Sequence, residues 1–148
     1  RDSVASRGLG DVYKRQYGNS VSKNVTKYTI DWRKNSRSKL QTKVKRFLQG
    51  YWKNQVVYEE FPVFGSRMKV DFLNATIKVA IEVQGPQHKK FNPFFHSNSR
   101  AKYLDSIKRD LEKARWLEEN GFLFVEVSEG EVKDISKEFF EKNFGIKL

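Results

Sequence analysis

Two acidic residues lie at matching positions in neighbouring apolar segments near the middle of the chain. Asp71 stands in the segment Met68–Leu73, and Glu82 stands in the next one, Ile77–Gln84. The residues between them have a strand, tight turn, strand pattern, so a hairpin would bring the two carboxylates side by side. Carboxylate oxygens are hard ligands that suit Mg²⁺ or a similar divalent ion. In a chain of formal net charge +11, such a pair favours metal-dependent chemistry on a polyanion.

The composition narrows the class of protein. The 148 residues fit one domain, and the contents of 38% hydrophobic and 14% aromatic residues favour a globular fold. The absence of cysteine excludes disulfides and thiolate zinc sites. With no bilayer-spanning apolar run and no secretory signal, we expect an intracellular, cytoplasmic protein without membrane contact. The excess of 29 Lys and Arg over 18 Asp and Glu favours a nucleic acid as partner, although any soluble basic protein has such a balance.

The N-terminal part of the chain looks different from the rest. Residues 1–16 lack periodicity and resemble translated read-through of a sequencing adaptor, so we expect them to lie outside the fold. Residues 17–35 are polar and predict a loosely ordered arm with a short strand around Tyr28–Ile30. Residues 36–148 then predict a single domain.

The elements that must position the acids follow in the order helix, three strands, helix, strand, helix. Ser36 or Ser38 caps the first helix, and Gly50 ends it. The three strands are expected over 56–61, 68–73 and 77–84, the long helix over 99–120, the fourth strand over 122–127 and the last helix over 132–143. The buried stripe of the first helix comprises Leu40, Val44, Phe47, Leu48 and Tyr51, that of the long helix Leu104, Ile107, Leu111 and Ala114, and that of the last helix Ile135, Phe139 and Phe140.

The alternation within the strands predicts which side chains share a face. In the third strand Ile77, Val79, Ile81 and Val83 point one way, and Ala80, Glu82 and Gln84 point the other. In the second strand Met68, Val70 and Phe72 oppose Asp71. The continuous apolar run of 122–127 predicts a strand buried on both faces.

Basic residues accompany the first helix. Arg37, Lys39, Lys43, Lys45 and Arg46 are expected opposite the buried stripe, where they either contact phosphates or form an ordinary solvated face. Our candidate nucleic-acid contacts are Arg37, Lys39, Lys43, Arg46, Lys89 and Lys90.

Several short motifs together carry a family resemblance. They are Glu60-Phe61-Pro62, Val70-Asp71-Phe72, the run from Ile81 to His88, Asp110-x-x-Lys113, and Gly121 before the last strand. Over residues 36–130 the chain resembles the PD-(D/E)xK nuclease superfamily, nearest to the very-short-patch-repair-type endonucleases and the related phage and mobile-element nucleases. The resemblance implies an α/β, restriction-endonuclease-like αβββαβ core with a mixed central sheet flanked by helices.

The resemblance also implies roles for residues of this chain. Asp71, Glu82 and the main-chain carbonyl of Val83 would bind Mg²⁺ or Mn²⁺, and Glu60 would add a further carboxylate. The implied activity is that of an endonuclease, hydrolysis of DNA phosphodiester bonds by in-line attack of water. A phage-encoded protein in a bacterial host is a plausible source, and double-strand cleavage would need a homodimer.

One residue departs from the family pattern. Gln84 stands where the family usually has a lysine, and its amide can orient a water molecule but carries no charge. Lys113 is the best replacement cation, unless it only forms a surface ion pair with Asp110. His88 is a candidate general acid or base, phosphate contact or structural residue. Phe94, Phe95 and His96 favour a hydrophobic cap over a base-stacking surface.

Two other classes of protein therefore stay open. A nuclease fold with a weakened or lost active site would serve as a DNA-binding module, and Gln84 keeps this alternative alive. A structural subunit that docks a partner would not need the basic face of the first helix to retain DNA.

Overall fold

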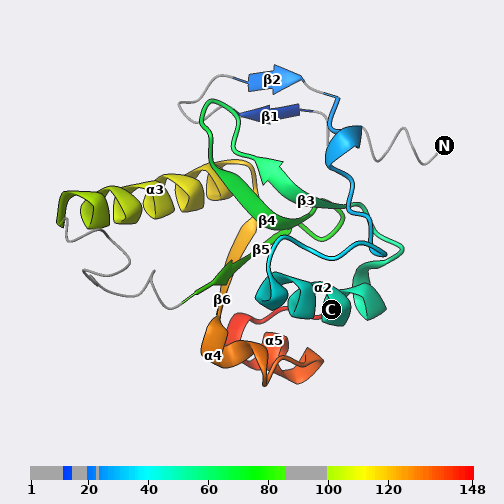
Figure 1. Cartoon of the computed structure of the whole chain (residues 1–148). Coiled ribbons are helices and arrows are strands. Elements are labelled where there is room, and N and C mark those ends of the chain that lie inside the picture. Colours follow the sequence, from blue (N-terminus) through cyan, green and yellow to red (C-terminus); the bar gives the residue numbers. More distant parts are fainter. Residues whose placement is uncertain (1–11, 15–19, 23, 86–99) are drawn as a thin grey trace.

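The structure is a computed structural model that describes residues 12–14, 20–22, 24–85 and 100–148. Figure 1 shows a small sheet with helices on both sides. The strands are β1 (Val12–Lys14), β2 (Ser20–Ser22), β3 (Val57–Pro62), β4 (Lys69–Asn74), β5 (Val79–Gln84) and β6 (Leu123–Ser128). The helices are the 3₁₀ turn η1 (Thr26–Tyr28), α2 (Lys39–Trp52), α3 (Arg100–Glu119), α4 (Glu129–Val132) and α5 (Lys137–Phe144).

The main sheet has four strands in the order β3-β4-β5-β6. The pairs β3–β4 and β4–β5 are antiparallel, whereas β6 runs parallel to β5. A parallel pair needs a long crossover, and here the connection contains α3. The expected α/β class with a mixed sheet and flanking helices is thus confirmed.

The sheet separates two hydrophobic clusters. On one face, Val44, Leu48 and Trp52 of α2 and Phe140 of α5 pack against β5 and β6. On the other face, Trp116 and Leu117 near the end of α3 pack against β3 and β4. Figure 1 shows α2, α4 and α5 on one side of the sheet and α3 on the other. The alternation in β5 is confirmed, because Val79 and Ile81 belong to the first cluster and Ala80 to the second.

The β4–β5 connection is shaped by an asparagine. The side-chain oxygen of Asn74 accepts hydrogen bonds from the N–H groups of Thr76 and Ile77, at 2.9 and 3.1 Å. Such an Asx turn closes the hairpin early, so the third strand begins at Val79 rather than at Ile77. The tight turn sets the register that pairs Phe72 with Ile81.

The predicted faces of β4 were partly wrong. Phe72 packs in the cluster on the α2 side, whereas Val70 packs in the cluster on the α3 side. The ladder between β3 and β4 explains the switch, since it skips Glu60 and Asp71 between two regular stretches. The register is the same on both sides, but Glu60 has a φ of 55°, so the regular pleat that strict alternation requires is broken there.

The predicted stripe of the long helix was also wrong. Leu104, Ile107 and Leu111 are exposed, and Ala114 is half-buried. The residues of α3 that are buried are Trp116 and Leu117. The 20-residue helix is longer than the short sheet that it covers, and among the described residues its C-terminal part is the one that packs on the sheet (Figure 1).

The prediction for the fourth strand failed for a related reason. We expected 122–127 to be buried on both faces, but β6 is an edge strand whose Leu123 is 48% exposed. Val125 and Val127 are buried, while Glu126 between them is exposed. Continuous apolar character therefore did not distinguish an edge strand from a central one.

Three helix boundaries differ from the prediction. Helix α2 passes through Gly50 and ends after Trp52, which is fully buried while Tyr51 is exposed. The last helix is divided into α4 and α5, because Ser128 and Ser136 each cap a new helix. Ile135, Phe139 and Phe140 nevertheless pack against the core as expected.

Parts of the N-terminal region form secondary structure. Within the segment that we expected outside the fold, Val12–Lys14 pairs with Ser20–Ser22 in an antiparallel ladder. In the arm, Val25 and Ile30 are buried, and the Ile30 N–H donates to the Val57 carbonyl at 3.0 Å. The expected strand around Tyr28 is reduced to one bridge between Thr29 and Tyr58.

Candidate active site

The two acids predicted to meet do meet, at a point where β4 and β5 separate. The ladder between these strands ends at the pair Phe72–Ile81, one residue before Asp71 and Glu82. Beyond it the side chains take the place of the missing backbone bonds. Glu82 Oε2 accepts the Asp71 N–H at 3.0 Å, and Asp71 Oδ2 accepts the Val83 N–H at 2.8 Å.

This geometry also directs the main-chain carbonyl of Val83. In an extended strand the N–H and C=O of one residue point to the same side. Because the Val83 N–H faces Asp71, the Val83 carbonyl is directed into the same gap. The two carboxylates and, by this backbone geometry, the Val83 carbonyl therefore border the gap between the strands.

Burial makes this carboxylate pair unusually basic. Asp71 is 3% and Glu82 is 8% exposed. Burial raises the pKa of Asp71 to about 7, and the negative charge of Glu82 acts in the same direction. Burial also raises the pKa of Glu82, against the opposing effect of Lys113. A nearby divalent cation would favour the ionised form of both groups.

Four acidic residues lie in one row across the sheet. The ladder pairs Glu59 with Phe72 and Phe61 with Val70, which leaves Glu60 opposite Asp71. On the other side, Glu82 is the direct register partner of Glu126 in β6. The row Glu60, Asp71, Glu82, Glu126 therefore takes one residue from each strand.

Glu60 is held in place from α2. Its φ of 55° lies in the left-handed region, which costs a residue with a Cβ about 1–2 kcal/mol. Its Oε2 accepts from Gln41 Nε2 at 3.0 Å and lies 3.2 Å from Arg37 Nε. Arg37 Nη2 also lies 3.6 Å from Asp71 Oδ1, so this guanidinium links two acids of the row.

Lys113 supplies a cation from the opposite side. Its ammonium forms a close ion pair with Glu82 Oε1, and both side chains are largely shielded from solvent. The residue lies in the C-terminal half of α3, the part of the helix that is packed on the sheet. Lys113 therefore pairs with Glu82 of the acid row.

Gln84 has a different partner. Its Nε2 donates to Glu126 Oε2 at 2.6 Å, on the same face of the sheet as Glu82. The amide is buried and spans from β5 to β6. Gln84 therefore orients Glu126, a residue that sequence reasoning missed although an isolated acid in Phe124-Val125-Glu126-Val127 was a visible signal.

The residues present fit a divalent cation. Within the described ranges there is no group of three or more His, Cys, Asp or Glu side chains arranged to hold a metal ion. Asp71, Glu82 and the Val83 carbonyl form a smaller set of hard oxygen donors, which suits Mg²⁺ because this ion usually keeps several water ligands. The pKa values of both acids are raised, chiefly by burial, so a bound cation would offset the cost of ionising them.

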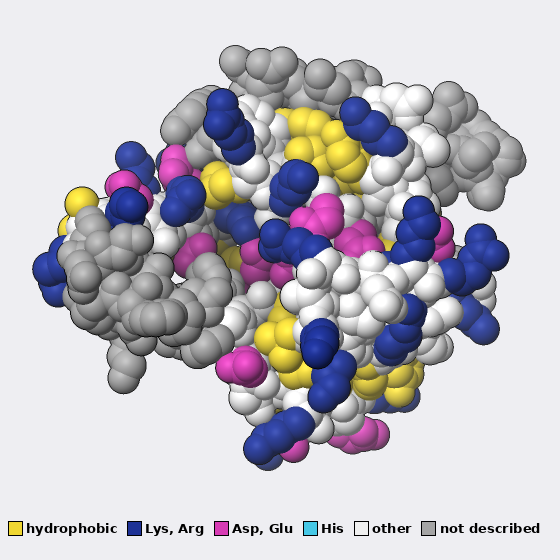
Figure 2. Space-filling model, in the orientation of Figure 1, with side chains coloured by type: hydrophobic (Ala, Val, Ile, Leu, Met, Phe, Trp, Pro, Cys, Tyr) yellow, Lys and Arg dark blue, Asp and Glu magenta, His cyan; other side chains and the backbone are white. Residues whose placement is uncertain are grey.

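Lys and Arg side chains surround Asp and Glu side chains on one face of the molecule. Figure 2 shows Asp and Glu side chains near the middle of the face, with Lys and Arg around them. Lys39 and Lys43 are exposed, as expected. Lys45 is not on the exposed face, because it is buried and its Nζ lies 2.8 Å from Glu59 Oε1.

The remaining predicted basic residues differ in their surroundings. The guanidinium of Arg46 donates to the Trp32 carbonyl and, at 3.0 Å, to the Asn35 side chain, so it fastens the segment before α2. This gives Arg46 a structural role in addition to any contact with phosphate. His88, Lys89 and Lys90 lie outside the described residues, as do Phe94, Phe95 and His96.

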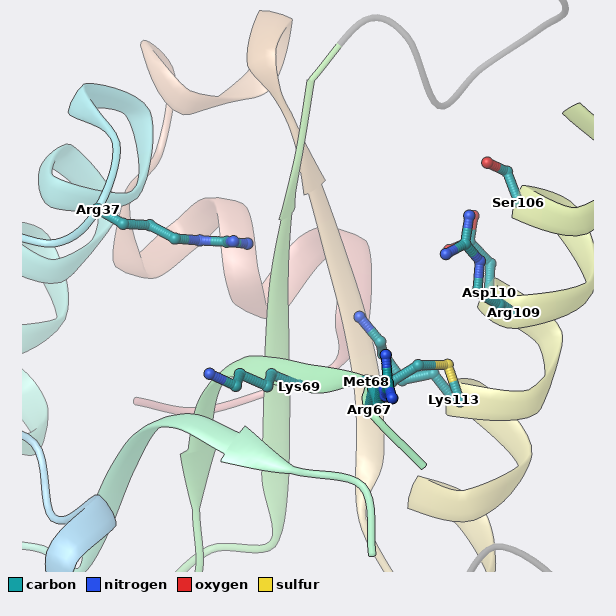
Figure 3. Close-up of a pocket in the computed structure, with 8 residues that line it drawn as sticks. All are labelled: Arg37, Arg67, Met68, Lys69, Ser106, Arg109, Asp110 and Lys113. Carbon is teal, nitrogen blue, oxygen red and sulfur yellow. The ribbon is translucent and has the colours of Figure 1, made fainter. Parts of the chain in front are cut away.

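A basic pocket adjoins the acid row and was not predicted. It has a volume of about 450 Å³ and lies between the beginning of β4 and α3 (Figure 3). Arg37 and Lys113 line it together with Arg67, Lys69 and Arg109. The sequence signals were Arg67 and Lys69 shortly before Asp71, and Arg109 one helical turn before Lys113.

Comparison with known proteins finds relatives in two iridescent viruses. The chain is 32% identical over 103 residues to "Uncharacterized protein 033L" of Invertebrate iridescent virus 3, which covers 64% of this chain and 50% of that protein. It is 33% identical over 75 residues to "Uncharacterized protein 307L" of Invertebrate iridescent virus 6, covering 51% and 37% respectively. The chain thus spans half or less of the length of these relatives. No family model and no solved structure matches it.

None of the helices in the part of the chain that the structure describes is both long enough and apolar enough to cross a bilayer.

Proposed function

We propose that this chain is a metal-dependent DNA endonuclease of the PD-(D/E)xK type, with Asp71 and Glu82 at its centre. The observation that carries the proposal is the separation of β4 and β5 at these two residues. Each carboxylate accepts a backbone N–H from the opposite strand, and the Val83 carbonyl faces the same gap. The site therefore presents oxygen donors in a buried position on a strongly basic chain.

The chain's own residues have distinct roles in this proposal. Asp71, Glu82 and the Val83 carbonyl would hold Mg²⁺ or Mn²⁺, which when bound would supply positive charge for the scissile phosphate and for an attacking water. Lys113 and Arg37 approach the acids from α3 and from the segment before α2. They would bind the phosphate oxygens and stabilise the charge that develops there. Gln84 holds Glu126 beside the site.

A DNA-binding module without cleavage is the second candidate. It is favoured by Gln84, whose uncharged amide is occupied by Glu126 rather than directed to Glu82. The pairing of Lys113 with Glu82 also supplies a compensating charge in the absence of a cation. A protein that only binds DNA would need neither a bound metal ion nor a lysine at position 84.

One experiment separates the two candidates. Relaxation of supercoiled plasmid is measured with EDTA, Mg²⁺ or Mn²⁺, and retention of the same DNA is followed by gel shift. Relaxation that requires the divalent ion supports the endonuclease. Retention without relaxation, with activity gained in Gln84→Lys, identifies the binding module and refutes cleavage by the natural sequence.

A further inference from the structure

The pocket beside the acid row has an unusual balance of charge. Among the described residues that line it, five are cationic, namely Arg37, Arg67, Lys69, Arg109 and Lys113, and Asp110 is the one carboxylate. Figure 3 shows these residues arriving from the segment before α2, from the beginning of β4 and from α3. Like charges gathered around a concave surface concentrate the positive potential there.

Only part of this charge is neutralised by the protein. Arg37 and Lys113 form ion pairs with acids of the row. For Arg67, Lys69 and Arg109, the described residues provide no ion pair and no side-chain hydrogen bond. These three cations are exposed and have no counter-charge among the described residues, so the pocket favours an anionic ligand.

We propose that this pocket binds a second phosphate group of the DNA strand whose neighbouring phosphate lies at the acid row. The inference rests on the proposed function, which places the first phosphate between Arg37 and Lys113. These two side chains border both the acids and the pocket, so the two phosphate positions adjoin. Phosphates of one strand are linked through a single nucleoside, which meets this requirement.

The types of residue in the pocket agree with a phosphate. Arg67 and Arg109 each carry a planar guanidinium that binds phosphate oxygens through paired hydrogen bonds. They come from two elements, one before β4 and the other on α3, so an anion in the pocket would meet guanidinium groups from both (Figure 3). Ser106 adds a hydroxyl donor. At about 450 Å³ the pocket has room for part of the attached nucleoside.

The test is DNA binding in EDTA, where no metal-dependent cleavage interferes. Fluorescence anisotropy gives the Kd of the natural sequence, Arg67→Gln, Arg109→Gln and the double variant for a labelled duplex at several salt concentrations. Lys108→Gln is the matched control, because Lys108 is an exposed cation next to Arg109 on α3 that does not line the pocket. Thermal denaturation checks that every variant is folded.

Each pocket variant is expected to weaken binding by roughly 5- to 10-fold and to reduce the salt slope of log Kd by about 1. Lys108→Gln should change Kd by less than about 2-fold, since a single exposed charge acts only through the general field. Equal effects of Arg109→Gln and Lys108→Gln, or no effect of either pocket variant, would overturn the inference.

Two arms identify which phosphate is bound, and a parallel assay separates the two proposals. The Kd values of the pocket variants are compared for duplexes with 5′-hydroxyl ends and with 5′-phosphate ends. If the Arg67 and Arg109 variants weaken binding of both duplexes equally, the pocket binds an internal diester. If they weaken binding of the 5′-phosphate duplex more, the pocket binds a terminal phosphate. If the pocket variants lose affinity but the natural sequence cleaves no DNA in any ion, the pocket stands and the endonuclease fails. If the natural sequence cleaves DNA with a divalent ion but the pocket variants bind DNA as tightly as it does, the endonuclease stands and the pocket fails.

Discussion

Asp71 and Glu82 take the places of backbone hydrogen-bond partners at the end of the β4–β5 ladder. Each accepts an N–H from the other strand and still has oxygen lone pairs free for another ligand. The spacing of the two residues was readable from the sequence. Their hydrogen bonds to backbone N–H groups of the opposite strand were not, because these bonds depend on the strands separating just at this register position.

The buried pair makes the stability of the protein depend on pH. The pKa of Asp71 rises from its ordinary value of 3.8 to about 7 in the folded chain. Between pH 3.8 and about pH 7, Asp71 is therefore protonated in the folded chain and ionised in the unfolded chain. The stabilising effect of this proton is complete below about pH 4 and is lost as the pH rises through 7. We expect Asp71→Asn to stabilise the metal-free protein at pH 8 by roughly 1–3 kcal/mol and to have little effect at pH 4.

Thermal denaturation in EDTA across this pH range measures the difference. Asp134→Asn is the control, since Asp134 is an exposed acid on the connection between α4 and α5. A Tm for Asp71→Asn that stays below that of the natural sequence at pH 8 would contradict the argument.

Lys113 is expected to matter for the rate of cleavage. Lys113→Met removes the ammonium beside Glu82 and should lower the single-turnover rate roughly 100-fold, because a positioned charge next to the reacting phosphate is lost. Adding Gln84→Lys to this variant should recover part of the rate. Arg115→Met is the control on the same helix, since Arg115 is exposed and lies 3.3 Å from Glu119 rather than near the site. Equal rates in Lys113→Met and the natural sequence would remove Lys113 from the mechanism.

At the scale of the elements, α2 does more than cover one face of the sheet. Gln41 donates to Glu59 and Glu60, both at 3.0 Å, and the buried Lys45 forms an ion pair with Glu59. Together they fix the position of β3 opposite Asp71. The helical pattern predicted α2, but it assigned Lys45 to the solvent because a lysine on its own gives no sign of a buried acid on another element.

This network gives a stability prediction. Lys45→Met leaves Glu59 without its cation in a poorly solvated place, so we expect a loss of about 3 kcal/mol in the free energy of unfolding. Lys43→Met, an exposed neighbour on the same helix, should change it by less than about 0.5 kcal/mol. Urea denaturation compares the two, and similar values for both variants would show that the ion pair has no structural role.

The predicted order of elements agrees with the structure, whereas several of their environments do not. Strand and helix periodicity located β3 to β6 and α3 within a few residues. It could not tell that β6 forms an edge or that much of α3 extends past the sheet, because both depend on how many strands the finished sheet contains. Likewise, Glu126 joins the acid row only through the parallel β5–β6 register.

At the scale of the whole molecule, the chain has a net charge of +11, and several of its cations lie beside the acid row. Basic residues from the segment before α2, the beginning of β4 and α3 meet beside the acid row, although they are far apart in sequence. The composition alone predicted a polyanionic partner. It could not indicate which cations gather in the pocket, since that follows from the tertiary fold.

Binding of a divalent ion should be visible in the stability of the whole chain. At pH 8, Mn²⁺ at about 100 times its Kd should add roughly 2.7 kcal/mol to the free energy of unfolding of the natural sequence. Asp71→Asn should gain much less, because it lacks one ligand. Tm measured against Mn²⁺ concentration provides the comparison, and equal shifts in both proteins would place the metal elsewhere.

The most direct test of the acid row is the single-turnover rate of DNA cleavage in Mn²⁺ by the natural sequence, Asp71→Asn and Asp134→Asn. If Asp71 and Glu82 form the centre of a nuclease, Asp71→Asn loses at least about 100-fold in rate while Asp134→Asn cleaves like the natural sequence. Equal cleavage by all three proteins, or none by any of them while DNA is still bound, would contradict a nuclease at this site.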